Sequence, residues 1–170
     1  MKYCSPLGVL LMALVGSACG TYSFTGTAIP EHVETIAIPI FEDGSRSAIP
    51  NLSDALTELL IDRFVNQTRL RLSSDEATAH TVLTGRIERY INRPAAVGGD
   101  ERAAVNRVNL SVTVQYLDRL KGIEMVPRRT FTAFGEYDPL EDGIEGEEEA
   151  AVAALEQIAD DIFNAATSDW

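Results

Sequence analysis

Apolar and polar residues alternate along several stretches of the chain, which is the pattern of strands in a sheet covered on one side only. The clearest strand is predicted over residues 107–116, and further strands are predicted over residues 36–40, 81–91 and 129–137, with a short one over residues 69–72. Pro39 cannot donate a ladder hydrogen bond, so the first strand should end there or lie at an edge. The apolar side of the clearest strand consists of Val108, Leu110, Val112, Val114 and Tyr116.

Two longer stretches repeat apolar residues every three or four positions, which predicts two amphipathic helices. The first should begin near Asn51 or Ser53, because both residue types suit a helix N-cap, and should run to about Asn66. The second should begin within the acidic segment 138–149, where carboxylates favour a helix N-terminus, and should run to about Thr167. The apolar stripes are Leu52, Leu56, Leu59, Leu60 and Phe64 in the first helix, and Val152, Leu155, Ile158, Ile162, Phe163 and Ala166 in the second.

The predicted elements follow the order strand, helix, three or four strands, helix. Each helix has one apolar stripe and the sheet has one apolar face, so the simplest way to bury all of them is to stack both helices on one side of the sheet. We therefore predict an α+β fold, a two-layer sandwich with two helices packed on one face of a mixed sheet of about four strands. A loop is expected over residues 92–104, and a turn at Lys121–Gly122. In the strand over residues 81–91, alternation assigns two faces: Leu83, Ile87 and Ile91 against Arg86, Glu88 and Tyr90.

Residues 1–18 have the layout of a secretory signal peptide: Lys2 precedes an apolar run over residues 7–15 and three small residues, 16–18. The run is too short to cross a bilayer as a helix, which takes about 20 apolar residues. Cys19 follows directly, and small residues before a cysteine resemble the processing site of bacterial lipoproteins. We expect the Cys19 thiol to carry acyl chains such as palmitate, which would anchor the mature protein to a membrane. The alternative is an ordinary leader cleaved nearby, with Cys19 a free thiol.

Beyond the leader, residues 19–30 are predicted to form a lipidated tether and residues 31–170 a single domain. A domain of this size can bury a stable core without disulfides, and no cysteine follows Cys19. The chain has 26 acidic and 14 basic residues and a net charge of −12. This charge argues against nucleic acid as a partner and against broad docking onto anionic lipid.

The sequence offers little for catalysis or metal binding. His32 and His80 are the only histidines, whereas a zinc site takes three or four nitrogen or sulfur ligands. The acidic residues over 141–149 lack the spacing of an EF-hand loop. Neither a G-x-S-x-G nucleophile motif nor a phosphate-binding P-loop occurs. We therefore predict that the protein is not an enzyme and needs no metal or cofactor.

The chain resembles the LptE family of lipopolysaccharide-assembly lipoproteins. The stretches that carry this resemblance, in order, are Cys19–Phe24, Ile36–Glu42, Pro50–Ser53, Leu56–Glu58, Asp62–Phe64, Arg107–Val114, Asp160–Asn164 and the final Trp170. The resemblance implies two helices packed on one side of a small sheet. It also implies a plug inside the LptD β-barrel of the outer membrane, facing the periplasm or the barrel lumen. There the protein would help to assemble the barrel, bind lipopolysaccharide and deliver it to the outer leaflet.

Lipopolysaccharide carries phosphates, so a contact site should present Arg or Lys on an exposed face. The best candidates are Arg86 and Arg107 on polar strand faces, together with Arg93 in the adjoining loop. Arg89 and the Arg128–Arg129 pair come next. The alternative is that these arginines are solvated and paired with nearby acids.

A second function from a different class is a regulator of an envelope complex. The stretch Ile36–Glu42 also resembles the opening strand of lipoproteins that activate peptidoglycan synthases, which have a similar small α/β build. The partner distinguishes the two hypotheses, because one requires a large β-barrel and the other a cell-wall synthase.

Overall fold

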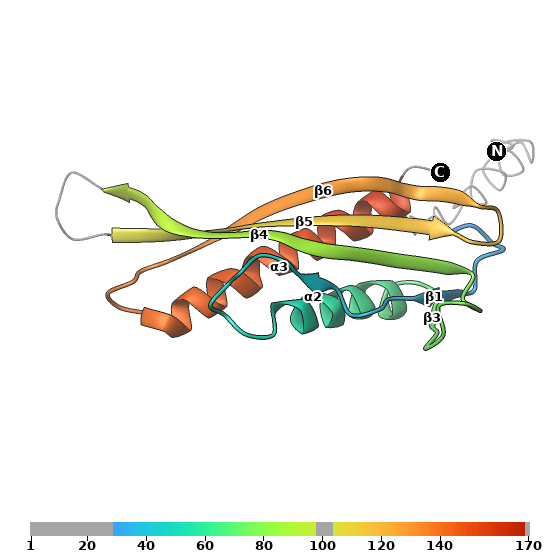
Figure 1. The fold of residues 1–170 in the computed structure, drawn as a ribbon, viewed down its shortest axis with the longest axis horizontal. Coiled ribbons are helices and arrows are strands. Elements are labelled where there is room, and N and C mark those ends of the chain that lie inside the picture. Colours follow the sequence, from blue (N-terminus) through green and yellow to red (C-terminus); the bar gives the residue numbers. More distant parts are fainter. Residues whose placement is uncertain (1–28, 98–103, 169–170) are drawn as a thin grey trace, which may run out of the picture.

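The computed structural model describes residues 29–97 and 104–168, which form an elongated molecule of two layers (Figure 1). Long strands build one layer, and the helices lie together against one face of it. The elements in chain order are β1 (Thr35–Ala37), β2 (Glu42–Asp43), α2 (Leu52–Ile61), the π-helix η1 (Asp62–Asn66), β3 (Arg71–Leu72), β4 (Thr81–Val97), β5 (Ala104–Asp118), β6 (Ile123–Tyr137) and α3 (Gly143–Ser168). The α+β class and the stacking of both helices on one side of a mixed sheet are confirmed.

The sheet has six strands, so the prediction of about four is wrong. Its order is β3-β1-β4-β5-β6, and β2 pairs with β4 outside this path. The pairings of β1, β2 and β3 are parallel, whereas β4, β5 and β6 form an antiparallel meander. The short strand predicted over residues 69–72 is confirmed as β3, although it covers only two residues. β2 also has two residues and was not predicted, because two residues are too few to leave a pattern of alternation in the sequence. The first strand ends at Ala37, before Pro39 as expected, and Ile40 lies exposed beyond it.

The loop predicted over residues 92–104 is wrong in its described part. β4 continues to Val97 and β5 begins at Ala104, and the two strands pair over this whole length. Pro94 is accommodated because the register shifts between Pro94 and Ala96, where a ladder hydrogen bond is not required. Residues 98–103 lie outside the described part of the chain. Arg93 therefore belongs to a strand and not to a loop.

The core lies between the sheet and the two helices. The ring of Phe64 in η1 meets the rings of Tyr116 and Phe163 edge to face, with centroids 5.6 and 5.3 Å apart. All predicted residues of the first stripe are buried except Leu59, which is half-buried. The buried residues of the two predicted stripes are Leu52, Leu56, Leu60 and Phe64, and Leu155, Ile158, Ile162, Phe163 and Ala166.

The N-terminal half of α3 approaches the sheet through small residues. Ala150, Ala151 and Ala154 are buried there, and Gly135 of β6 lies directly below Ala150. Val152, which was predicted to be in the stripe, is 40% exposed because the alanines occupy the inward positions. Within the described residues, no helix combines the length and the apolar character needed to cross a bilayer.

Candidate functional site

The most distinctive surface is the face of β4, β5 and β6 that the helices leave uncovered, which we call the open face. On β5, the residues that point to this face are polar and alternate with buried apolar residues, as the sequence predicts. They are Arg107, Asn109, Ser111, Thr113 and Gln115. Since the pleat sends every second side chain outward, the clearest strand in the sequence supplies the central row of this face.

A bulge in β4 determines which arginines reach the open face. The register shifts between Ile87 and Arg89, so the alternation reverses at that point. The assignment of Tyr90 to the face of Arg86 is therefore wrong. Tyr90 turns toward the helices, where its hydroxyl donates a hydrogen bond of 2.6 Å to Glu147 of α3. Burial, followed by this contact with Glu147, raises the pKa of Tyr90 above its ordinary value.

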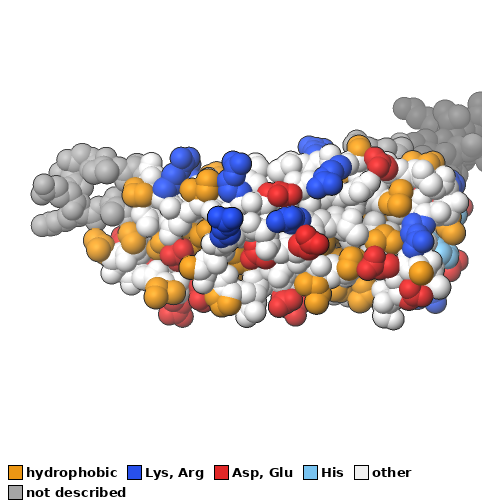
Figure 2. All heavy atoms as spheres, in the orientation of Figure 1, with side chains coloured by type: hydrophobic (Ala, Val, Ile, Leu, Met, Phe, Trp, Pro, Cys, Tyr) orange, Lys and Arg blue, Asp and Glu red, His pale blue; other side chains and the backbone are white. Residues whose placement is uncertain are grey.

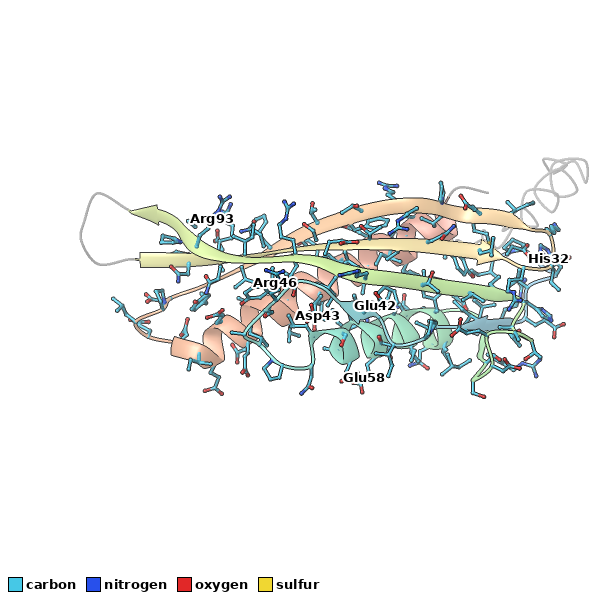
Figure 3. All side chains as sticks on the ribbon, in the orientation of Figure 1. His32, Glu42, Asp43, Arg46, Glu58 and Arg93 are labelled. Carbon is cyan, nitrogen blue, oxygen red and sulfur yellow. The ribbon has the colours of Figure 1, made fainter. Side chains whose placement is uncertain are left out.

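Beyond the bulge, three β4 residues line the open face: Arg89, Ile91 and Arg93. The sequence placed Ile91 on the apolar side, but the structure exposes it. Arg93 projects from the side of β4 that is away from the helices (Figure 3). The bulge thus brings two arginines and an apolar side chain to a surface where simple alternation would have put Glu88, Tyr90 and Asn92.

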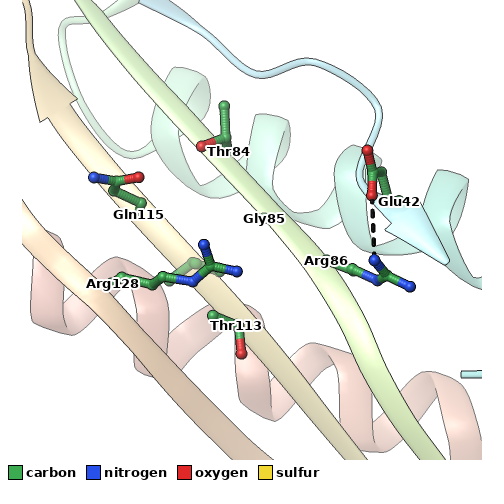
Figure 4. Close-up of a pocket in the computed structure, with 8 residues that line it drawn as sticks. Glu42, Thr84, Gly85, Arg86, Thr113, Gln115 and Arg128 are labelled. Atoms are coloured by element: carbon green, nitrogen blue, oxygen red, sulfur yellow. Dashed lines mark ion pairs between the residues drawn. The ribbon is translucent and has the colours of Figure 1, made fainter. Parts of the chain in front are cut away.

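The open face has two shallow hollows. The first, of about 230 Å³, lies between Arg86 of β4 and Arg128 of β6 (Figure 4). Its polar lining comes from Thr84, Thr113 and Gln115. These hydroxyl and amide groups can donate and accept hydrogen bonds, while the two guanidinium groups can bind an anion.

Arg86 is held at the rim of this hollow by acids. Its guanidinium lies 3.7 Å from a carboxylate oxygen of Glu42 in β2 and 4.0 Å from one of Glu88. Gly44 allows this position, since a Cβ at residue 44 would lie 2.3 Å from the guanidinium. Arg86 and Glu42 are largely exposed, so this ion pair contributes little to stability and can exchange for a stronger anion.

The second hollow, of about 260 Å³, combines charge with apolar surface. Arg89 and Arg93 line it together with the exposed side chains of Ile91 and Phe134. Arg107 stacks over the Phe134 ring at 4.2 Å from the ring centroid and pairs with Glu136 at 2.9 Å. Within the described residues, no acid lies within 4.0 Å of the guanidinium groups of Arg89, Arg93 or Arg128.

Charge is distributed unevenly between the two layers. The helical layer, α2, η1 and α3, carries ten acids and a single arginine, Arg63. Strands β4 to β6 carry six arginines and four acids. Figure 2 shows Lys and Arg side chains concentrated over the strands, with most of the acidic side chains nearer the helices. An anion that approaches this strongly acidic protein is therefore directed to the open face.

The three predicted contact residues, Arg86, Arg93 and Arg107, all reach the open face, but they do not form one cluster. Arg86 belongs to the first hollow and Arg93 to the second, while Arg107 lies beside Phe134. Sequence reasoning missed the apolar part of the second hollow, because Phe134 carried no signal of its own. Arg129 contacts the ring of Phe131, which is buried toward the helices, and takes no part in either hollow.

The open face combines arginine side chains with exposed apolar surface, an arrangement that suits binding of an anionic amphiphile. Among the residues that the structure describes, no group of three or more His, Cys, Asp or Glu side chains could hold a metal ion. Cys19 and most of the predicted tether lie outside these residues.

Two solved structures share the fold. A hypothetical protein from Chlamydia trachomatis has a TM-score of 0.54 at 11% identity, covering 81% of this chain and 99% of its own. A protein from Xanthomonas campestris has a TM-score of 0.50 at 13% identity, covering 80% and 82%. Similarity at this level establishes the fold alone.

The sequence itself is informative about the family. No curated protein matches the chain in sequence. In contrast, the model of the LptE family, described as lipopolysaccharide-assembly, matches residues 33–166, which is most of the chain and nearly all of the described domain. The chain therefore belongs to the LptE family of lipopolysaccharide-assembly lipoproteins.

Proposed function

We propose that this protein is an outer-membrane lipoprotein that plugs an LptD-like β-barrel, helps to assemble it, and binds lipopolysaccharide on its way to the outer leaflet. Membership of LptE, a family of non-enzymatic lipoproteins, supports a role in assembly and binding over catalysis. The observation that carries the proposal is the open face, where arginines gather on a chain whose net charge is −12. Such a concentration of one sign against the overall charge is expected of a binding surface.

The chemistry of the open face corresponds to the parts of a phosphorylated glycolipid. Guanidinium groups bind phosphate with two parallel hydrogen bonds. The row of hydroxyl and amide side chains on β5 can bind sugar hydroxyls. Ile91 and Phe134 offer apolar surface for the beginning of an acyl chain. A soluble sugar phosphate would use the arginines but would leave these two side chains uncovered.

A triple variant tests this binding. Arg86→Ala, Arg93→Ala and Arg107→Ala together should weaken binding of purified lipopolysaccharide by a hundredfold or more, since each lost charge-assisted hydrogen bond is worth about 1.5–3 kcal/mol. The matched control is Arg71→Ala, which removes an exposed arginine paired with Glu34 at the far edge of the sheet. If the triple variant keeps wild-type affinity, the open face is not the binding surface.

Anchoring is the second part of the proposal. Residues 1–18 act as the signal peptide, Cys19 is acylated, and residues 19–30 tether the domain, which faces the periplasm or the barrel lumen. Globomycin, which blocks processing of lipoprotein precursors, should cause the precursor to accumulate, and Cys19→Ser should abolish palmitate labelling. Normal processing in the presence of globomycin, with the mature product free in the periplasm, would show that this part is wrong.

The partner is tested by isolating the lipidated protein from membranes and identifying what is recovered with it by mass. A large β-barrel protein is expected. Recovery of a cell-wall synthase without any barrel would contradict the proposal and would favour the role of an envelope regulator.

A further inference from the structure

The segment that leads toward Cys19 enters the domain at a fixed point. Arg69 donates hydrogen bonds to the carbonyl oxygens of Ile29 and Pro30, at 3.0 and 2.6 Å. His32 Nε2 lies 2.6 Å from Oδ2 of Asp118, the last residue of β5. His32 is found at the end of the molecule where β5 turns into β6 (Figure 3). The tether therefore leaves the domain beside the β5–β6 turn.

The β5–β6 turn, residues 119–122, is itself firmly built. Asp118 Oδ1 accepts hydrogen bonds from the backbone N–H groups of Leu120 and Lys121, at 2.9 and 3.0 Å. Gly122 has a φ of 67°, a conformation that glycine adopts without strain. The turn presents Leu120 to solvent with 56% of its surface exposed, and Ile123, the first residue of β6, is 50% exposed beside it. Exposed apolar side chains also occur at the opposite end of the molecule, where Leu140 is 81% exposed, so it is the nearness of the tether that makes Leu120 and Ile123 candidates for an external contact.

The length of the tether limits how far this turn can be from the membrane. Ten peptide steps lead from Cys19 to Ile29, which span at most about 35 Å when fully extended. A strand as long as β6, with 15 residues, measures about 50 Å. The opposite end of the domain, where α3 begins, is thus farther from the point where the tether enters than the full length of the extended tether (Figure 1).

We propose that the β5–β6 turn contacts the phospholipid leaflet that holds the acyl chains of Cys19, with Leu120 and Ile123 at the level of the headgroups. The inference rests on the proposed acylation of Cys19. Contact with lipid removes apolar surface from water, and the Lys121 stem can lie along the surface with its ammonium group among the phosphates. Glu124 follows Ile123, so the turn carries both signs of charge and the contact depends on apolar burial. It should therefore be insensitive to salt and to the share of anionic lipid.

The experiment uses the lipidated protein reconstituted in vesicles of phosphatidylethanolamine and phosphatidylglycerol. Since no cysteine follows Cys19, a single cysteine carries an environment-sensitive fluorophore at Leu120→Cys or, as the matched control, at Leu140→Cys. Leu140 is 81% exposed and lies in the loop before α3, at the opposite end. Brominated lipids should quench the probe at 120 and shift its emission to shorter wavelength, at low and high salt alike, and should leave the probe at 140 unaffected.

A second set of variants tests whether the apolar side chains hold the turn at the lipid, or whether the turn is merely close to the membrane. With the probe at Lys121→Cys, the pair Leu120→Asp and Ile123→Asp should abolish quenching, whereas Leu140→Asp should not. Flotation of the vesicles reports the anchor independently. If the protein floats but the probes at 120 and 140 behave alike, the anchor stands and the turn contact is wrong. If the protein does not float, the acylation and the turn contact are both wrong.

Discussion

Replacing Gly135 by alanine would place a methyl group where β6 and α3 are closest. A Cβ built on Gly135 lies 2.0 Å from the carbonyl oxygen of Ala150, 2.6 Å from its carbonyl carbon and 2.8 Å from its Cα. These atoms belong to the helix backbone, so no side-chain rotation can relieve the overlap. The helix must move away from the sheet, and the buried alanines around Ala150 would lose contact with it.

Two opposing effects determine how Gly135→Ala changes the free energy of unfolding. An alanine restricts the unfolded chain more than a glycine does, which by itself would stabilise the protein by about 0.4–1 kcal/mol. Overpacking a well-filled core costs about 1–3 kcal/mol, and the upper part of that range applies because the obstacle is backbone. We expect Gly135→Ala to lower the free energy of unfolding by about 2 kcal/mol, which corresponds to a decrease in Tm of about 4–8 °C.

Urea unfolding and thermal melting measure this effect. Ala150→Gly should not restore stability in the double variant, because it removes a methyl group and leaves the carbonyl oxygen in place. Gly122→Ala is a useful contrast: nothing lies near its added Cβ, but the positive φ alone should cost about 1–2 kcal/mol, and Gly122→Asn should recover most of it. A Gly135→Ala protein as stable as the wild type would show that β6 and α3 are not in such close contact.

Three further predictions concern the core and the titrating groups. Phe64→Ala should lower the free energy of unfolding by about 3–5 kcal/mol in urea titrations, and a loss below about 1 kcal/mol would contradict the packing of the three rings. Burial raises the pKa of Asp118, but hydrogen bonds from His32 and from the turn outweigh it and leave the pKa below its ordinary value. Asp118 therefore stabilises the fold at neutral pH, and this contribution disappears as the pH falls through the lowered pKa. Asp118→Asn should cost about 1–3 kcal/mol at pH 7 and progressively less as the pH is lowered, and a loss that does not change with pH would show that the ionised carboxylate is not what stabilises the fold. Burial raises the pKa of Tyr116 to about 12, so its contribution to the stability of the fold is complete below its unfolded pKa and is lost at higher pH. The difference in ultraviolet absorbance between the wild type and Tyr116→Phe should titrate near pH 12, and titration near pH 10 would contradict the burial of this side chain.

Period-two patterns predict a strand well only where the register is regular. The alternation of β5 is uninterrupted in its central part, so the sequence assigned its buried and open sides correctly. In β4, the bulge after Ile87 reverses the faces, and nothing in the local pattern marks it. Tyr90 was placed on the wrong face for this reason. Its hydroxyl reaches Glu147 only in the folded chain, so the compensation for its burial was not visible in the sequence.

The helical layer shows a comparable limit. Leu52, Leu56, Leu60 and Phe64 are spaced by four residues, and in an α-helix such a row drifts slowly around the axis. The wider turn of η1, which includes Phe64, keeps this last ring in the core. The stripe was predictable from the spacing, but the change of helix type was not. Val152 was misplaced because α3 approaches the sheet through alanines, a preference set by Gly135 on another element.

The set of residues that line each hollow depends on the register between neighbouring strands. The alternation of β5 predicted that Arg107 is exposed, and the alternation before the bulge in β4 assigned Arg86 to the polar face. Arg86 and Arg128 are distant in sequence and meet across the first hollow because β5 lies between their strands. That register, together with the bulge, decides which cations share a hollow, and neither is determined by local residue order.

The position of β1 has a mechanical consequence. This strand lies inside the sheet, parallel to β3 on one side and to β4 on the other, and it follows closely on the segment that leads to the tether. Tension applied from the N-terminal side acts lengthwise on β1, so its bonds to both neighbours are sheared together and cannot be peeled apart one at a time. A protein pulled through this segment should resist extraction more strongly than its few paired residues suggest.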